Sequence, residues 1–195
     1  MNKDTNRYRG KVDIAFKKNN YITKKVTHNT GLSDMALLFA KAITGNMNYS
    51  EDIPRLLDIG YMVPSATVDE YELSNGIWMS ILNSPANIGG RQYKYDESLE
   101  NWVGVLTTTV YYSDLNGAIL NEVLERAGQG YIDLKVRLCS YNYKNRKYFA
   151  EVDITPSEIQ EIKDSTSAIF SWYTELLYNA EDMSDSMKSD VTVVQ

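Results

Sequence analysis

Few side chains in this sequence could carry out nucleophilic or metal-assisted chemistry, because the chain has one histidine, His28, and one cysteine, Cys139. A Ser-His-Asp or Cys-His site would have to use His28 as its general base. An Asn-Thr-Gly sequence follows His28, so we expect a hydrogen-bonded loop histidine instead. Cys139 falls on the outward parity of a predicted strand, and the chain has too few thiolates and imidazoles for a zinc site.

Three other patterns could bind an anion, bind calcium or cleave a glycosidic bond. Gly89, Gly90 and Arg91 could cradle an anion, but no Walker or dinucleotide fingerprint surrounds them, and a turn is expected. Residues 114–117 read Asp-Leu-Asn-Gly without the ligand spacing of an EF-hand, so they predict a cap and a turn. Two catalytic carboxylates can come from anywhere in a chain, and no segment points to such a pair. We therefore expect no enzymatic activity, no cofactor and no metal site.

Length and composition indicate one globular domain. The chain has 195 residues, a hydrophobic fraction of 43% and a net charge of −6, which argues against nucleic-acid binding by the whole chain. No apolar run reaches membrane-spanning length, and the first residues lack the apolar region of a signal peptide, so we expect synthesis in the cytosol and no membrane partner. Fifteen tyrosines against four phenylalanines suit half-exposed sheet faces or subunit contacts, although a β-rich composition alone would also explain them.

Charge is unevenly distributed between the two ends of the chain. Basic residues crowd the first 25 positions, whereas Glu181, Asp182, Asp185 and Asp190 lie near the C-terminus. Copies packed start to end would be electrostatically matched, and two solvated surfaces are the alternative. Two kinds of subunit contact are expected. Basic residues would face an acidic surface of a partner: Arg7, Arg9, Lys17 and Lys18. A β-prone terminal arm would add to a neighbouring sheet edge through Val191, Val193 and Val194, and a frayed end is the alternative.

The predicted elements are organised around residues 102–127. Residues 102–112 are β-branched or aromatic on both parities, which predicts a central strand covered on both faces. Residues 119–127 then place apolar side chains at helical spacing, with Ser113 or Asp114 as the expected cap and Gly128 as the expected left-handed stop.

Further strands are predicted on either side of this unit, over residues 11–16, 21–26, 54–63, 77–82, 91–96, 131–141 and 147–154. Turns are expected at 17–20 and 84–90, and a surface loop at 64–75. Residues 168–177 fit a helix or a strand, and the strand is favoured because of their aromatic content.

Two more helices have recognisable ends. Ser33 is expected to cap a helix that Gly45 closes, and a Thr-Pro-Ser-Glu sequence from Thr155 predicts a capping box. The sum is a β-rich α+β fold, an antiparallel β-sandwich decorated with two or three short helices. It would comprise an N-terminal arm, a single β-rich domain and an acidic C-terminal tail, over residues 1–10, 11–178 and 179–195.

Two segments of the chain resemble virion proteins of tailed bacteriophages. In the first, an Asn-Thr-Gly turn from Asn29 precedes a short helix that ends at Gly45, and the strand that follows ends in Ile-Gly at Gly60. In the second, a strand from Val105 leads to an Asn-Gly turn at Asn116 and then to a Glu-Val pair. The chain is also similar to small structural proteins of crAss-like phages. Residues 64–75 and the acidic tail have no counterpart in this resemblance.

The resemblance implies a non-enzymatic part of a tailed-phage virion, assembled in the host cytoplasm. The expected position is a ring, collar or tail at the portal vertex, and the expected partners are copies of the chain and portal, ring, tail or capsid subunits. A capsid decoration protein or head-fibre anchor is an alternative. A carbohydrate- or receptor-binding module is an alternative of another class, in which exposed tyrosines, Trp78 and Trp102 would stack on sugars.

Overall fold

Alternating apolar side chains build two antiparallel sheets, which a computed structural model describes over residues 8–18, 21–28, 30–31, 33–48, 51–63, 76–97, 101–142 and 146–176. The first sheet contains β1 (Tyr8–Lys18), β2 (Tyr21–His28), β7 (Gly90–Asp96), β8 (Asn101–Tyr111) and β11 (Ser167–Leu176). The second contains β3 (Thr30–Gly31), β4 (Leu56–Val63), β5 (Ile77–Ser80), β6 (Ala86–Asn87), β9 (Leu134–Cys139) and β10 (Tyr148–Asp153). The helices are α1 (Ser33–Ile43), α2 (Leu120–Gly128) and α3 (Pro156–Ser165), with a 3-10 turn η1 (Tyr112–Asp114).

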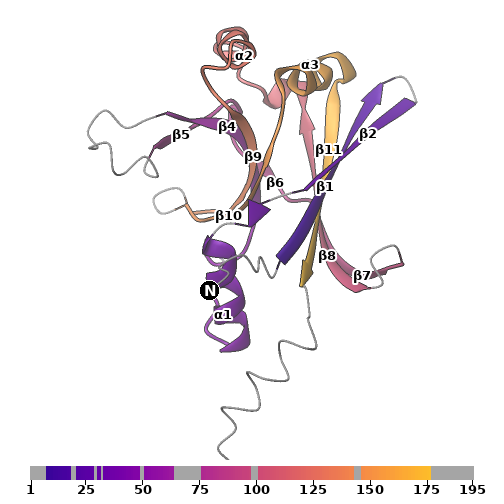
Figure 1. The fold of residues 1–195 in the computed structure, drawn as a ribbon, viewed down its shortest axis with the longest axis vertical. Coiled ribbons are helices and arrows are strands. Elements are labelled where there is room, and N and C mark those ends of the chain that lie inside the picture. Colours follow the sequence, from indigo (N-terminus) through magenta and orange to yellow (C-terminus); the bar gives the residue numbers. More distant parts are fainter. Residues whose placement is uncertain are drawn as a thin grey trace, which may run out of the picture.

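The two sheets face each other as a sandwich (Figure 1), so the predicted β-rich α+β architecture is confirmed. The strand order is β2-β1-β11-β8-β7 in the first sheet and β3-β10-β9-β4-β5 in the second, where β6 also pairs with β4. β11 lies between β1 and β8, which confirms that residues 168–177 favour a strand. The β9–β10 hairpin is also confirmed.

The core fills the space between the sheets. Every second residue of a strand points to it, as two-residue alternation requires. Ile14, Phe170 and Trp172 come from the first sheet and Ile59 and Val136 from the second, and all five are fully buried. Each fully buried aliphatic or phenyl side chain of this kind stabilises the fold by about 1.5–3 kcal/mol.

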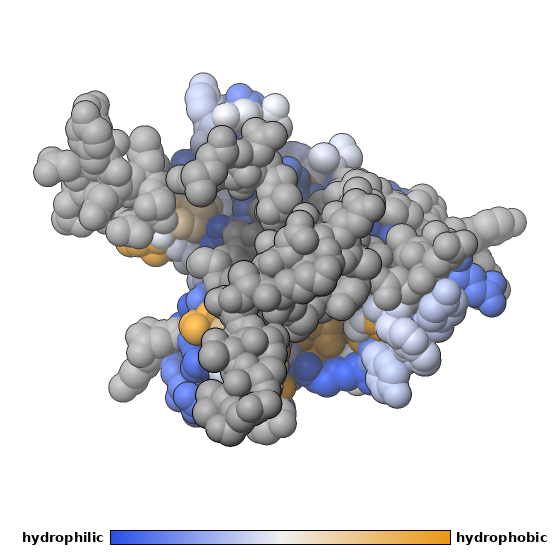
Figure 2. Space-filling view, turned by 60° about the horizontal axis from the view of Figure 1, so that its bottom comes forward, coloured by the Kyte–Doolittle hydropathy of each residue, from blue (hydrophilic) through white to orange (hydrophobic). Residues whose placement is uncertain are grey.

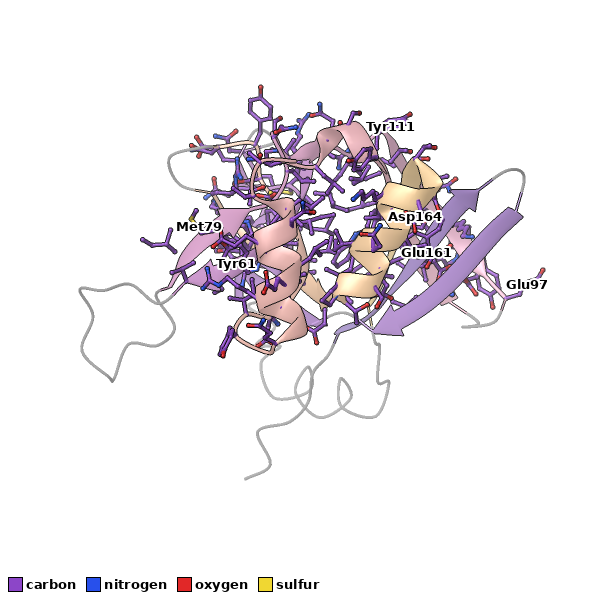
Figure 3. All side chains as sticks on the ribbon, turned by 90° about the horizontal axis from the view of Figure 1, so that it is seen from above. Tyr61, Met79, Glu97, Tyr111, Glu161 and Asp164 are labelled. Atoms are coloured by element: carbon purple, nitrogen blue, oxygen red, sulfur yellow. The ribbon has the colours of Figure 1, made fainter. Side chains whose placement is uncertain are left out.

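Helices α2 and α3 close one end of the sandwich. Figure 3 shows them side by side across this end, and Ile159 and Ile162 of α3 are fully buried beneath. The predicted capping box is confirmed: Thr155 Oγ1 accepts a hydrogen bond from the Glu158 N–H at 3.3 Å, and the Glu158 carboxylate accepts one from the Thr155 N–H at 2.8 Å. Helix α1 lies at the opposite end, against β10, and we call this the open end (Figure 1).

Several predicted boundaries are wrong at turns. Asp114 accepts the Tyr111 N–H at η1 instead of capping α2, which begins at Leu120 without a side-chain cap. The left-handed glycine after α2 is Gly130 rather than Gly128. β1 runs from Tyr8 to Lys18, into both the expected arm and the expected turn, because it pairs with β11 at one end and with β2 at the other. Residues 84–90 contain the two-residue strand β6 as well as a turn.

Candidate interaction surface

A buried carboxylate lies on the outer face of the second sheet. Asp58 of β4 is fully buried and accepts hydrogen bonds from Trp78 Nε1 at 3.0 Å, Ser80 Oγ at 2.5 Å and Arg146 Nη1 at 3.3 Å. Burial raises the pKa of this carboxyl, while the hydrogen bonds from Ser80 and Trp78 and the charge of Arg146 act in the opposite direction. Each oxygen of Asp58 therefore has a donor, and the site joins β4 and β5 to Arg146, two residues before β10.

Arg137 of β9 extends this network. Its guanidinium carbon lies 4.2 Å from the centre of the Trp78 ring and 4.9 Å from that of Tyr148, and it forms an ion pair with Glu151 at 2.8 Å. A guanidinium held between two rings and a carboxylate is a stabilising arrangement. These charges and rings contact one another, so the network connects β5, β4, β9 and β10. We call it the clamp, and its members are Asp58, Trp78, Ser80, Arg137, Arg146, Tyr148 and Glu151.

Gly60 provides the room that Trp78 needs. A Cβ at Gly60 would lie 2.2 Å from the Met79 carbonyl oxygen and 2.9 Å from the Trp78 indole, whereas a Cβ at Gly104 would meet nothing within 4 Å. We expect Gly60→Ala to lower the free energy of unfolding by about 1–3 kcal/mol, because the added methyl group overpacks the site. Gly104→Ala should raise it by about 0.5–1 kcal/mol, the usual difference between these residues in a strand. Urea denaturation of both variants measures the two free energies of unfolding. The same change in both variants would contradict the close packing of Trp78 against Gly60.

Cys139 is buried next to the clamp. It has no exposed surface, and burial raises the pKa of its thiol to about 12. At pH 8 its thiolate fraction should be about 1 in 10,000, compared with about a quarter for an ordinary thiol of pKa 8.5. We therefore expect Ellman's reagent to leave the folded protein unlabelled and to label one thiol per chain in urea. Rapid labelling of the folded protein would show that this side of the sheet opens.

A second buried carboxylate, Asp52, holds α1 in place. It accepts hydrogen bonds from Lys41 Nζ of α1 at 2.8 and 2.9 Å, from Lys147 Nζ and from the Asn48 N–H at 2.8 Å. Asp34, in the first turn of α1, accepts the Tyr148 N–H at 2.8 Å. Both ends of α1 are thereby fastened to the start of β10.

These contacts make the stability of the fold sensitive to acid. The hydrogen bonds from Lys147, Lys41 and Asn48 hold the pKa of Asp52 well below its usual range. A depressed folded-state pKa stabilises the fold above the unfolded value of about 3.9, and the stabilisation is lost as pH falls through the folded-state pKa. Asp52→Asn should therefore unfold at lower urea than the wild type at pH 7, and the gap should narrow below about pH 4. A gap that stays constant down to pH 2 would contradict this account.

An apolar groove lies at the open end, between α1 and the β7–β8 pair. Met35 and Leu38 of α1 form one wall, and Tyr93, Gly104 and Leu106 contribute to the other. Its volume is about 410 Å³. Figure 2 turns this end toward the viewer and shows hydrophobic surface in a recess bordered by hydrophilic side chains. The β7–β8 wall belongs to the inner face of the first sheet, where Leu106 packs against the core.

Three exposed aromatic side chains continue this inner face. Tyr95 pairs with Trp102 and Tyr93 with Gly104 in the β7–β8 register, so all four residues share one face with Leu106. Tyr93, Tyr95 and Trp102 are 77%, 50% and 59% exposed. The Trp102 ring lies 5.3 Å from Tyr93 and 5.8 Å from Tyr95, at interplanar angles of 43° and 73°. We call these three residues the aromatic cluster; with the groove, it forms the candidate interaction surface.

The residues expected at subunit contacts are only partly described. Arg9, Lys17 and Lys18 belong to β1, where Arg9 pairs with Glu175 and Lys18 with Tyr21. Arg9 and Lys17 are eight residues apart along one strand, roughly 26 Å at 3.3 Å per residue, so they do not form one patch. Four more of the expected residues lie outside the described part of the chain: Arg7, Val191, Val193 and Val194.

Within the residues that the structure describes, no group of three or more His, Cys, Asp or Glu side chains could hold a metal ion. In the same part of the chain, no helix is both long and apolar enough to cross a membrane. Comparison of the chain with protein-family models, with curated proteins and with solved structures finds no match.

Proposed function

We propose that this protein is a non-enzymatic structural component of a tailed-phage virion, a ring, collar or tail subunit that assembles in multiple copies near the portal vertex. The observation that carries the proposal is the candidate interaction surface at the open end. Large aromatic side chains exposed beside an apolar groove are typical of protein contacts, where tyrosine and tryptophan are enriched. The sequence resemblance supplies the virion context.

The edges of the sandwich also support assembly. β7 and β5 are outer strands, and within the described residues the far edge of each is unpaired. An unpaired edge presents backbone donors and acceptors to another chain. Copies could therefore join through sheet edges as well as through the aromatic cluster.

Purified particles test the virion context. Phage particles would be isolated in a density gradient from a culture in which this chain is expressed. Mass spectrometry would then quantify peptides of the chain in the particle band and in the soluble fraction. The proposal expects the peptides to be enriched in the particle band at a fixed ratio to the capsid protein. Peptides confined to the soluble fraction would contradict it.

A carbohydrate-binding module is the second candidate, because the aromatic cluster is exposed. Sugar stacking needs an open ring face, but Trp102 packs at steep angles against two tyrosines, and the Trp78 ring is covered by Arg137. This geometry favours a protein contact. Glycan-array binding that is lost in Trp102→Ser, from a protein that stays monomeric, would favour the second candidate.

A further inference from the structure

The groove reaches β7, whose outer edge is unpaired within the described residues. The side chains of β7 that share a face with the groove are Arg91, Tyr93 and Tyr95. A strand added beside β7 would pair with its backbone and would place every second side chain on this same face. β-Branched residues favour the extended backbone of such a strand.

The sequence contains one segment that matches these requirements. Residues 191–194 read Val-Thr-Val-Val, and Val191 and Val193 would share one face of an added strand. In the sequence they follow residues 177–190, which come directly after β11, and Thr174 near the end of β11 lines the groove. At up to about 3.5 Å per residue, the 14 residues 177–190 can span up to about 49 Å, which is enough to reach an adjacent molecule.

Charge also favours this segment. Arg91 lies at the groove, where its guanidinium donates a hydrogen bond to the Pro54 carbonyl at 2.6 Å. Burial, and then the nearby charge of Arg55, lower the pKa of Arg91, so two like charges lie close together here. Asp190, directly before the valines, would bring a negative charge to this pair.

We infer that the groove between α1 and β7 binds the C-terminal segment 190–195 of a neighbouring copy as an added β-strand. The inference rests on the proposed assembly in multiple copies and names the contact that joins them. The segment and the groove are different surfaces, so each copy both gives a strand and receives one.

Cysteine cross-linking between full-length chains tests this contact. One copy carries Val193→Cys and the other carries Leu38→Cys in the groove wall, while the buried Cys139 stays in place. After mixing, subunit exchange and oxidation, we expect a product of twice the 22.2 kDa chain mass. Its yield should exceed that obtained with Tyr131→Cys, on an exposed position beyond α2, by on the order of ten-fold, since proximity raises the effective concentration of the thiols.

A substitution that fills the groove provides a second test of this contact. Gly104→Leu adds a side chain where a Cβ meets no atom within 4 Å, so it should block the groove without disturbing the fold, and Gly128→Leu in α2 is its matched control. In the receiving copy, Gly104→Leu should abolish the cross-link and Gly128→Leu should not.

Three results would overturn the inference: equal yields with Leu38→Cys and Tyr131→Cys, no effect of Gly104→Leu, or a cross-link formed only within a single chain carrying both Leu38→Cys and Val193→Cys. If the protein still forms oligomers in those cases, the proposed assembly stands and only this contact fails. A protein that is monomeric throughout would contradict the assembly itself.

Discussion

Replacing Asp58 by alanine is expected to lower the free energy of unfolding by about 3–5 kcal/mol, the usual cost of removing one partner of a buried ion pair. The substitution would leave the Arg146 guanidinium, the Trp78 indole N–H and the Ser80 hydroxyl without their common acceptor. Because two of these donors come from β5 and the third, Arg146, lies two residues before β10, the loss should loosen the second sheet around β4. Urea denaturation followed by tryptophan fluorescence measures the effect.

Asp153 provides the matched control for Asp58. It is also an aspartate whose carboxylate forms an ion pair on the second sheet, with Lys135 at 3.1 Å, but its side chain is 83% exposed. Exposed pairs contribute only about 0–1 kcal/mol, so Asp153→Ala should scarcely change the midpoint. Similar destabilisation by both substitutions would contradict the clamp.

Replacing Trp102 by serine is expected to weaken self-association by about 30-fold or more, because an aromatic residue at the centre of an interface commonly contributes at least 2 kcal/mol. Trp102 contacts both Tyr93 and Tyr95, so its loss removes the centre of the aromatic cluster. Trp102 is 59% exposed in the single chain, and the fold itself should therefore change little. Analytical ultracentrifugation over a range of concentrations gives the dissociation constant.

Tyr131→Ser is the control for this variant. Tyr131 is 73% exposed but lies after α2, away from the groove and the aromatic cluster. Its loss should leave association unchanged. If Trp102→Ser associates as tightly as Tyr131→Ser, the aromatic cluster is not the contact surface.

Local patterns in the sequence predict much of the fold. The capping box at Thr155 depends on neighbouring residues alone, and the β9–β10 hairpin joins adjacent strands, so both can be predicted. The pairing of β1 with β11 joins opposite ends of the chain, and nothing local specifies it. The predicted start of α2 is wrong because Asp114 can cap more than one backbone group, and tertiary contacts decide which group it caps.

Most of the candidate interaction surface cannot be predicted from the sequence. The alternation in residues 91–96 predicts a strand, but the groove also requires α1 to lie opposite that strand. Contacts of Asp52 with Lys41 and Lys147 hold α1 there. One feature of the sequence points to the clamp, namely an aspartate, Asp58, within the otherwise apolar strand β4. Its partners Trp78, Ser80 and Arg146 lie 20, 22 and 88 positions further along the chain, so only the folded structure brings them together.

The mass of the purified full-length chain in solution tests the central claim most directly. Light scattering at rising concentration, at low and high salt, compares the wild type with Trp102→Ser. Assembly through the open end predicts a multiple of 22.2 kDa for the wild type and a shift toward the single-chain mass for the variant. A wild-type protein that stays at 22.2 kDa at every concentration and salt would contradict a subunit that assembles through its own surfaces.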